Sequence, residues 1–142
     1  MSQIIQNQRI DAPFEGKLFL IEDVADIRES FTIMLELCGC NVVPFENGQT
    51  ALDQLDVLEP CAAIIDLEMP QFNGFEIAQR IRQGSQHQDI VLAALTGDDQ
   101  PGVRERALEI GFDLFFKKPT SGKTVFVEIQ RLIKFGQPQR QS

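Results

Sequence analysis

Five short apolar segments alternate with five segments of helical periodicity, and this alternation constrains the fold of the chain more than any other feature. The apolar segments are residues 17–23, 41–45, 61–66, 89–96 and 114–116. The segments with helical periodicity are residues 26–38, 47–59, 74–83, 100–111 and 121–136. Strands joined through helices form parallel crossovers, which are right-handed and place helices on both faces of the sheet. The sequence therefore predicts an α/β fold, a doubly wound parallel sheet of five strands with five helices.

Two of the apolar segments add detail to this sheet. Residues 61–66 are continuously apolar up to Asp66, as expected for a strand that is covered on both faces. Pro44 has no backbone N–H to donate to a neighbouring strand, so we expect residues 41–45 to form an edge strand. The flavodoxin-like strand order 2-1-3-4-5 is a common form of such sheets, and it places ligands at the carboxyl ends of strands 1 and 3.

Polar side chains follow the predicted strands at this carboxyl edge. Glu22 and Asp23 end the first strand, Asp66 the third and Thr96 the fourth, and Lys118 follows the fifth. Taken singly, each has an ordinary explanation: Glu22 and Asp23 could cap the next helix, and Asp66 could hydrogen-bond its own turn. The conjunction favours chemistry, because clustered carboxylates attract a cation such as Mg²⁺, and a hydroxyl with an ammonium group suits phosphoryl oxygens. We therefore interpret Asp66 as a carboxylate nucleophile that can form an acyl phosphate.

Charge and composition argue against several other functions. The formal net charge of −8 disfavours binding to nucleic acid backbones, which requires a basic face. No apolar run reaches the roughly 18 residues of a membrane span, and the N-terminal sequence lacks the pattern of a signal peptide. Cys38, Cys40 and Cys61 form no regular framework, so we interpret them as reduced thiols rather than metal ligands. We expect a cytoplasmic protein that binds neither nucleic acid nor membrane.

Four motifs, taken in this order, resemble the receiver domain of response regulators in two-component signalling. They are Glu22-Asp23, "DLEMP" with Gly74 eight residues after Asp66, Thr96-Gly97, and "LFFKKP". The resemblance covers residues 17–135. It leaves residues 1–16 as an N-terminal extension and residues 136–142 as a C-terminal tail.

The resemblance implies a role for each matching residue. Asp66 is expected to accept a phosphoryl group from a phosphohistidine, and Thr96 and Lys118 are expected to bind the phosphoryl oxygens. The Lys118–Pro119 peptide bond is expected to be cis. The expected Mg²⁺ ligands are Glu22, Asp23, Asp66 and the backbone carbonyl of Glu68.

The resemblance also implies a conformational switch, in which phosphorylation draws Thr96 inward and Phe115 fills the space that Thr96 vacates. Two features depart from the family pattern. Glu68 and Asp98, two residues beyond Asp66 and Thr96, are both acidic. Their side chains could lie over the mouth of the site and alter the lifetime of the acyl phosphate. Phe115 lacks the hydroxyl that a tyrosine would carry at the switch position.

We interpret the chain as a stand-alone phosphoacceptor receiver and not an enzyme, its chemistry being limited to self-catalysed phosphotransfer and autodephosphorylation. The expected phosphodonor is a histidine kinase or a histidine phosphotransfer protein. The expected output is contact with a downstream protein, through the face formed by the fourth helix, fifth strand and fifth helix or through the first helix. On the first helix, Ile33 and Leu37 lie off the apolar stripe and form a candidate docking spot.

Two alternatives stay open. A receiver excised from a hybrid kinase or a longer regulator would carry the same motifs. A phosphatase of the haloacid-dehalogenase type also forms an aspartyl phosphate. That class places its nucleophile at the end of the first strand with a second Asp two residues on, a pattern that "IEDVAD" does not provide.

Overall fold

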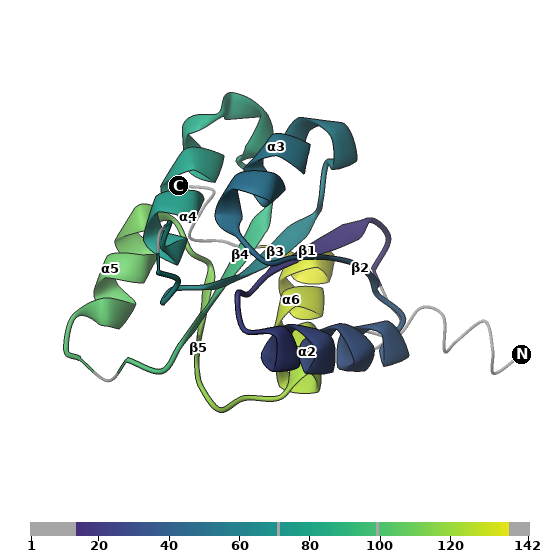
Figure 1. The fold of residues 1–142 in the computed structure, drawn as a ribbon. Coiled ribbons are helices and arrows are strands. Elements are labelled where there is room, and N and C mark those ends of the chain that lie inside the picture. The colour runs from purple at the N-terminus through teal and green to yellow at the C-terminus, as the bar shows by residue number, and fades with distance from the viewer. Residues whose placement is uncertain (1–13, 71, 99, 137–142) are drawn as a thin grey trace, which may run out of the picture.

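The computed structural model describes residues 14–70, 72–98 and 100–136 (Figure 1). Its strands are β1 (Lys17–Ile21), β2 (Asn41–Phe45), β3 (Ala62–Asp66), β4 (Val91–Thr96) and β5 (Leu114–Lys117). Its helices are α2 (Ala25–Leu37), α3 (Gly48–Leu58), α4 (Gly74–Gln83), α5 (Val103–Ile110) and α6 (Gly122–Phe135), with a short 3₁₀-helix, η1 (Ser85–His87). Each strand and α-helix begins and ends within a few residues of the segment that the sequence predicts.

The strands form a five-stranded parallel sheet in the order β2-β1-β3-β4-β5. This order confirms the doubly wound, flavodoxin-like arrangement predicted from the sequence. Strand β2 lies at one edge, as the presence of Pro44 indicates. Helices α2 and α6 cover one face of the sheet, and α3, α4 and α5 cover the other (Figure 1).

The side chains of the central strands divide between two apolar cores, one on each face of the sheet. In β1, Phe19 and Ile21 pack under α3 and α4, whereas Leu18 and Leu20 pack under α2 and α6. All five residues of β3 are buried, as expected for a strand covered on both faces. Asp66 ends this strand and is only 2% exposed, so the fold holds a carboxylate at the border of its apolar core.

The ends of the helices carry the residues that their local structure requires. The Asn47 side chain caps α3, accepting a hydrogen bond from the backbone N–H of Thr50 at 2.9 Å, and this confirms the predicted cap. Gly39 follows α2 with φ of +95°, a conformation in which glycine has no side chain to clash. The chain therefore leaves α2 through a left-handed turn and enters β2.

The surface of α2 matches the sequence pattern. Phe31 and Leu35 are buried, while Ile33 and Leu37 are 59% and 76% exposed. At the N-terminal side, Phe14 is buried and stacks on Phe126 of α6, with ring centroids 6.1 Å apart. Residues 1–13 and 137–142 of the predicted extension and tail lie outside the described residues. Within the part of the chain that the structure describes, no helix is long and apolar enough to cross a membrane.

Candidate functional site

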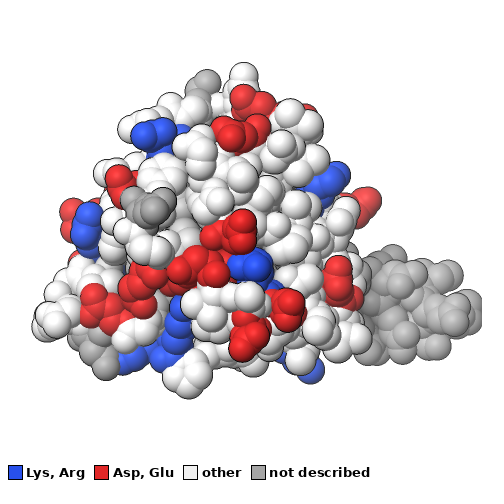
Figure 2. All heavy atoms as spheres, in the orientation of Figure 1, with Lys and Arg blue, Asp and Glu red and all other residues white. Residues whose placement is uncertain are grey.

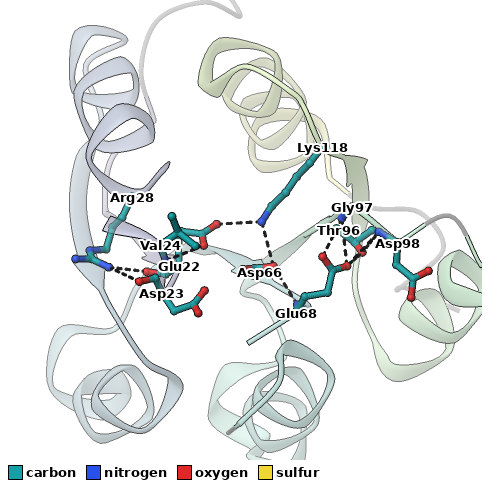
Figure 3. Close-up of polar contacts among 10 residues, drawn as sticks. All are labelled: Glu22, Asp23, Val24, Arg28, Asp66, Glu68, Thr96, Gly97, Asp98 and Lys118. Carbon is teal, nitrogen blue, oxygen red and sulfur yellow. Dashed lines mark hydrogen bonds and ion pairs between the residues drawn. The ribbon is translucent and has the colours of Figure 1, made fainter. Parts of the chain in front are cut away.

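The carboxyl ends of β1, β3, β4 and β5 bring together the polar residues that the sequence singles out. Because the strands are parallel and in register, Asp66 lies opposite Leu95 of β4, next to Thr96, and Ile21 of β1 pairs with Ile65. Glu22, Asp66 and Thr96 are each at most 2% exposed. Asp and Glu side chains gather in a band across the face drawn in Figure 2. Figure 3 shows the site itself, which consists of two groups of residues, with Asp66 in the first group on the side that faces the second.

The first group, called here the acidic half, consists of Glu22, Asp23, Asp66 and Lys118. The ammonium Nζ of Lys118 lies 3.3 Å from Asp66 Oδ1 and 3.4 Å from Glu22 Oε1. The same Asp66 oxygen accepts a hydrogen bond from the backbone N–H of Glu68 at 3.0 Å. Asp66 therefore does hydrogen-bond its own turn, as the ordinary explanation of this residue requires, and it also contacts the lysine.

Burial and neighbouring charge shift the pKa of two groups in the acidic half. Desolvation, followed by repulsion from Asp66, raises the pKa of Glu22 from 4.5 to about 7. Desolvation alone would lower the pKa of Lys118, but the carboxylates of Asp66 and Glu22 outweigh it and the pKa is raised. The acidic half is thus a cluster of carboxylates that a single ammonium group compensates only in part.

The acidic half fits a divalent cation. One ligand oxygen from each of Glu22, Asp23 and Asp66 can be chosen so that the three lie within 4.8 Å of one another. Among the described residues, the buried oxygen Asp23 Oδ1 has no hydrogen-bond partner, and the buried Glu22 Oε1 has only the Lys118 ammonium, at 3.4 Å. Buried carboxylate oxygens without donors are what a hard cation such as Mg²⁺ satisfies.

Arg28 of α2 fixes the loop that carries Glu22 and Asp23. Its Nη1 donates to the backbone oxygens of Glu22 at 2.9 Å and of Asp23 at 3.3 Å (Figure 3). Glu22 Oε2 accepts from the backbone N–H of Val24, the N-cap residue of α2, but this N–H precedes the helix, so the contact does not cap it in the way that the ordinary explanation of this acidic pair supposes. Arg28 was not predicted as a site residue, because Arg28 contacts backbone atoms, which carry no sequence signal.

The start of α4 lies directly against the carbonyl of Asp66. A Cβ atom at Gly74 would lie 2.5 Å from Asp66 O, closer than real Cβ contacts, so a side chain at this position would require the backbone to shift. The Asn73 side chain accepts from the N–H of Glu76, and the Glu76 carboxylate accepts from the N–H of Asn73. This capping box holds the helix start in place, and it explains the family spacing between Asp66 and Gly74.

The second group, called here the donor half, consists of Thr96, Gly97, Asp98 and Glu68. The Thr96 hydroxyl and the backbone N–H groups of Gly97 and Asp98 all donate to the carboxylate of Glu68 (Figure 3). The Thr96 hydroxyl also accepts from the N–H of Asp98 at 2.9 Å, which fixes its orientation. The donor half is therefore an anion site whose donors already hold an anion from the chain itself.

Of the two acids expected over the mouth of the site, the structure brings only Glu68 onto the donors. The Asp98 side chain instead accepts from the N–H of Gln100 at 2.8 Å, within its own loop. Phe115 of β5, the residue that the resemblance implies for the switch, is half-buried and lies under the guanidinium of Arg104 from α5, 5.7 Å from the ring centroid. The Lys118–Pro119 peptide bond is cis, as the resemblance implies.

Comparison with known proteins agrees with this geometry. Residues 18–130 match the family described as the response regulator receiver domain. The chain is 32% identical over 133 residues to the probable transcriptional regulator ycf27 of Guillardia theta, a match that covers 92% of this chain and 51% of that protein. The chain thus spans about half the length of the curated relatives it matches.

Solved structures show the same fold. The signal receiver domain of a signal transduction histidine kinase from Syntrophus aciditrophicus superposes with a TM-score of 0.77 at 26% identity, covering 84% of this chain and 91% of that one. The chemotaxis protein CheY4 of Vibrio cholerae superposes with a TM-score of 0.77 at 24% identity, covering 83% of this chain and 98% of that one.

Proposed function

The chain belongs to the response regulator receiver family, and on that premise we propose that Asp66 accepts a phosphoryl group from the phosphohistidine of a histidine kinase or a histidine phosphotransfer protein. The observation that carries the proposal is the position of Asp66, which is 2% exposed, lies 3.3 Å from the Lys118 ammonium and is flanked by two further carboxylates. A buried carboxylate is costly unless it is paired, and the partner of Asp66 is a lysine whose charge would also suit a phosphoryl group.

The proposed chemistry is a single displacement at phosphorus. An oxygen of Asp66 forms the new P–O bond of an acyl phosphate, while the P–N bond to the donor histidine breaks and the imidazole leaves with the electron pair. Such transfers have a loose transition state, so the chain contributes mainly positioning and charge. Lys118 provides positive charge beside the attacking oxygen, and Thr96 with Lys118 would bind the phosphoryl oxygens.

We propose that Glu22, Asp23 and Asp66, with the backbone carbonyl of Glu68, hold a Mg²⁺ ion. The buried Asp23 Oδ1, which has no hydrogen-bond partner among the described residues, and the buried Glu22 Oε1, which has only Lys118, support this assignment. Bound there, Mg²⁺ would neutralise charge on the transferring phosphoryl oxygens. Arg28 would keep the two metal-binding residues in place through their backbone oxygens.

Receiver domains are signalling domains that interact with histidine kinases and downstream effectors. For this chain we propose output by protein contact, through the face of α5, β5 and α6 that contains Phe115, or through α2, where Ile33 and Leu37 are exposed. Thr96 and Phe115 would form the switch. We propose no catalysis beyond phosphotransfer and autodephosphorylation. We also propose no nucleic acid binding by these residues, because the net charge is −8.

The curated relatives are about twice as long as the matched region, and the relative from Guillardia theta is described as a transcriptional regulator. A receiver that forms part of a longer regulator or of a hybrid kinase is therefore the alternative form of the same proposal. The phosphotransfer chemistry at Asp66 is common to both forms. A cytoplasmic location also stays a prediction.

The test of the function is the mass of the intact protein after incubation with acetyl phosphate and Mg²⁺. The wild-type chain should gain one phosphoryl group, and Asp66→Asn should gain none. Asp89→Asn, which removes an exposed acid before β4, is the matched control and should react like wild type. A phosphoryl gain in Asp66→Asn equal to that of wild type would show that Asp66 is not the acceptor.

A further inference from the structure

The donor half presents three hydrogen-bond donors to one carboxylate. The Gly97 N–H lies 3.0 Å from Glu68 Oε1 and 3.1 Å from Oε2, and the Asp98 N–H lies 3.2 Å from Oε2. The Thr96 hydroxyl, fully buried, also donates to Oε2. Hydrogen bonds to an ionised group are stronger than neutral ones, so this contact is the main polar interaction of the 96–98 loop.

The same donors face the position that a phosphoryl group on Asp66 would occupy. Asp66 ends β3 and Thr96 ends the adjacent β4, and the backbone N–H of Glu68 is bonded to Asp66 itself. In Figure 3 the Glu68 side chain lies between Asp66 and the three donors. A phosphoryl oxygen that approached the Thr96 hydroxyl would therefore find that hydroxyl already hydrogen-bonded to the Glu68 carboxylate.

The two anions cannot share these donors. A phosphoryl group brings a charge of about −1.5 to −2 beside the carboxylate, so the two anions repel each other while they compete for the same donors. Glu68 is exposed, so its side chain can swing into solvent without disturbing the core.

We infer that the Glu68 carboxylate is an internal anion that occupies the phosphoryl-oxygen site of the unphosphorylated chain and must be displaced when Asp66 carries a phosphoryl group. This inference rests on the proposed function. The Glu68 carboxylate then competes with the phosphoryl group for the same donors. This role differs from an effect of its charge on a water that attacks the acyl phosphate. It also means that Thr96 is held at the site before any phosphoryl group arrives.

The test is the affinity of the full chain for beryllium fluoride in the presence of Mg²⁺, followed by amide NMR signals of Gly97 and Asp98. Glu68→Ala, which empties the site, should bind the probe about tenfold more tightly or better than wild type. Glu68→Gln keeps the shape of the side chain but removes its charge, and its affinity should lie between the two. In the unliganded Glu68→Ala protein the two amide signals should move, since both N–H groups lose their acceptor.

The matched control is Asp26→Asn, which removes a charge from an exposed side chain in the first turn of α2 that belongs to neither half of the site. Its affinity should stay within about twofold of wild type, the range of a partly screened charge. Equal gains in Asp26→Asn and Glu68→Ala would overturn the inference, because they would show a general effect of charge. Unchanged or weaker binding by Glu68→Ala would also overturn it.

Asp66→Ala separates this inference from the function on which it rests. If wild type binds the probe and Asp66→Ala does not, while the Glu68 variants match wild type, the proposed function stands and the inference alone is wrong. If no variant shows binding that depends on Asp66 and Mg²⁺, the proposed function and the inference fail together.

Discussion

In the acidic half of the site three carboxylates lie around one ammonium group, whereas in the donor half three hydrogen-bond donors surround one carboxylate. The acidic half has more carboxylate oxygens than donors: among the described residues, the buried Asp23 Oδ1 has no hydrogen bond and the buried Glu22 Oε1 has only Lys118. The donor half has its donors satisfied. The acidic half therefore suits the addition of a cation, whereas the donor half suits the replacement of one anion by another.

The largest expected effect concerns the excess negative charge of the acidic half. Glu22 has a pKa raised to about 7, so in the folded chain it holds its proton more tightly than in the unfolded chain. Its contribution to stability is therefore fully present below pH about 4.5 and is lost as the pH rises through about 7. Glu22→Gln cannot ionise, so relative to wild type it should gain on the order of 3 kcal/mol of unfolding free energy across this range.

This prediction is measured by urea unfolding of the wild-type and Glu22→Gln proteins in a metal chelator at several pH values. Taking the difference in unfolding free energy between the two proteins at each pH cancels the contributions of the other titrating acids. Added Mg²⁺ should shrink the difference, since a cation compensates the ionised carboxylates. Parallel stability profiles in the chelator would show that Glu22 is not the group responsible.

A second, smaller effect is expected from Asp23→Asn. Removing one of three clustered carboxylates should raise the metal-free unfolding free energy by about 1 kcal/mol and abolish the stabilisation that Mg²⁺ gives to wild type. Thermal unfolding with and without Mg²⁺ measures both changes.

The control for Asp23→Asn is Asp26→Asn, an exposed acid in the first turn of α2. Its neutralisation should lower stability by a few tenths of a kcal/mol through the helix dipole, with the Mg²⁺ response kept. An intact Mg²⁺ response in Asp23→Asn would remove this residue from the metal site.

The smallest expected effect separates the two acids near the donor half. Glu68→Gln should change the rate at which phosphorylated protein loses its phosphoryl mass by more than about threefold, because the carboxylate that the phosphoryl group displaces remains attached two residues from Asp66. Asp98→Asn should change the rate by less, since its carboxylate is held by Gln100 N. Mass spectra of the loaded proteins over time measure both rates. A larger change in Asp98→Asn than in Glu68→Gln would reverse the assignment.

The acidic half could be predicted from the sequence because its residues end strands. Apolar runs fix where β1 and β3 stop, and parallel strands place those stops at one edge, so Glu22, Asp23 and Asp66 had to lie close together. The hydrogen bond that the Gln100 N–H donates to the Asp98 side chain follows a local rule for Asp in turns, and it could have been predicted too.

The arrangement of the donor half could not be predicted in the same way. Glu68 lies in the loop after β3, where no strand alternation sets the direction of its side chain. Its partners, the amides of Gly97 and Asp98, are backbone groups of a different loop that follows β4. Contacts of a side chain with distant backbone groups leave no pattern in the sequence. The contacts of Arg28 are local, but they too are with backbone oxygens, which every residue type carries.

The contact of Lys118 with Asp66 has a consequence for the order in which the chain is synthesised. All three carboxylates of the acidic half precede residue 70, whereas Lys118 and the covering helix α6 come near the end. A nascent chain emerging from its N-terminus therefore carries the repelling charges well before their lysine is made. Since burying uncompensated carboxylates is unfavourable, we expect the pairing of β1 with β3 to be less stable in the ribosome-bound fragment before Lys118 is made than after.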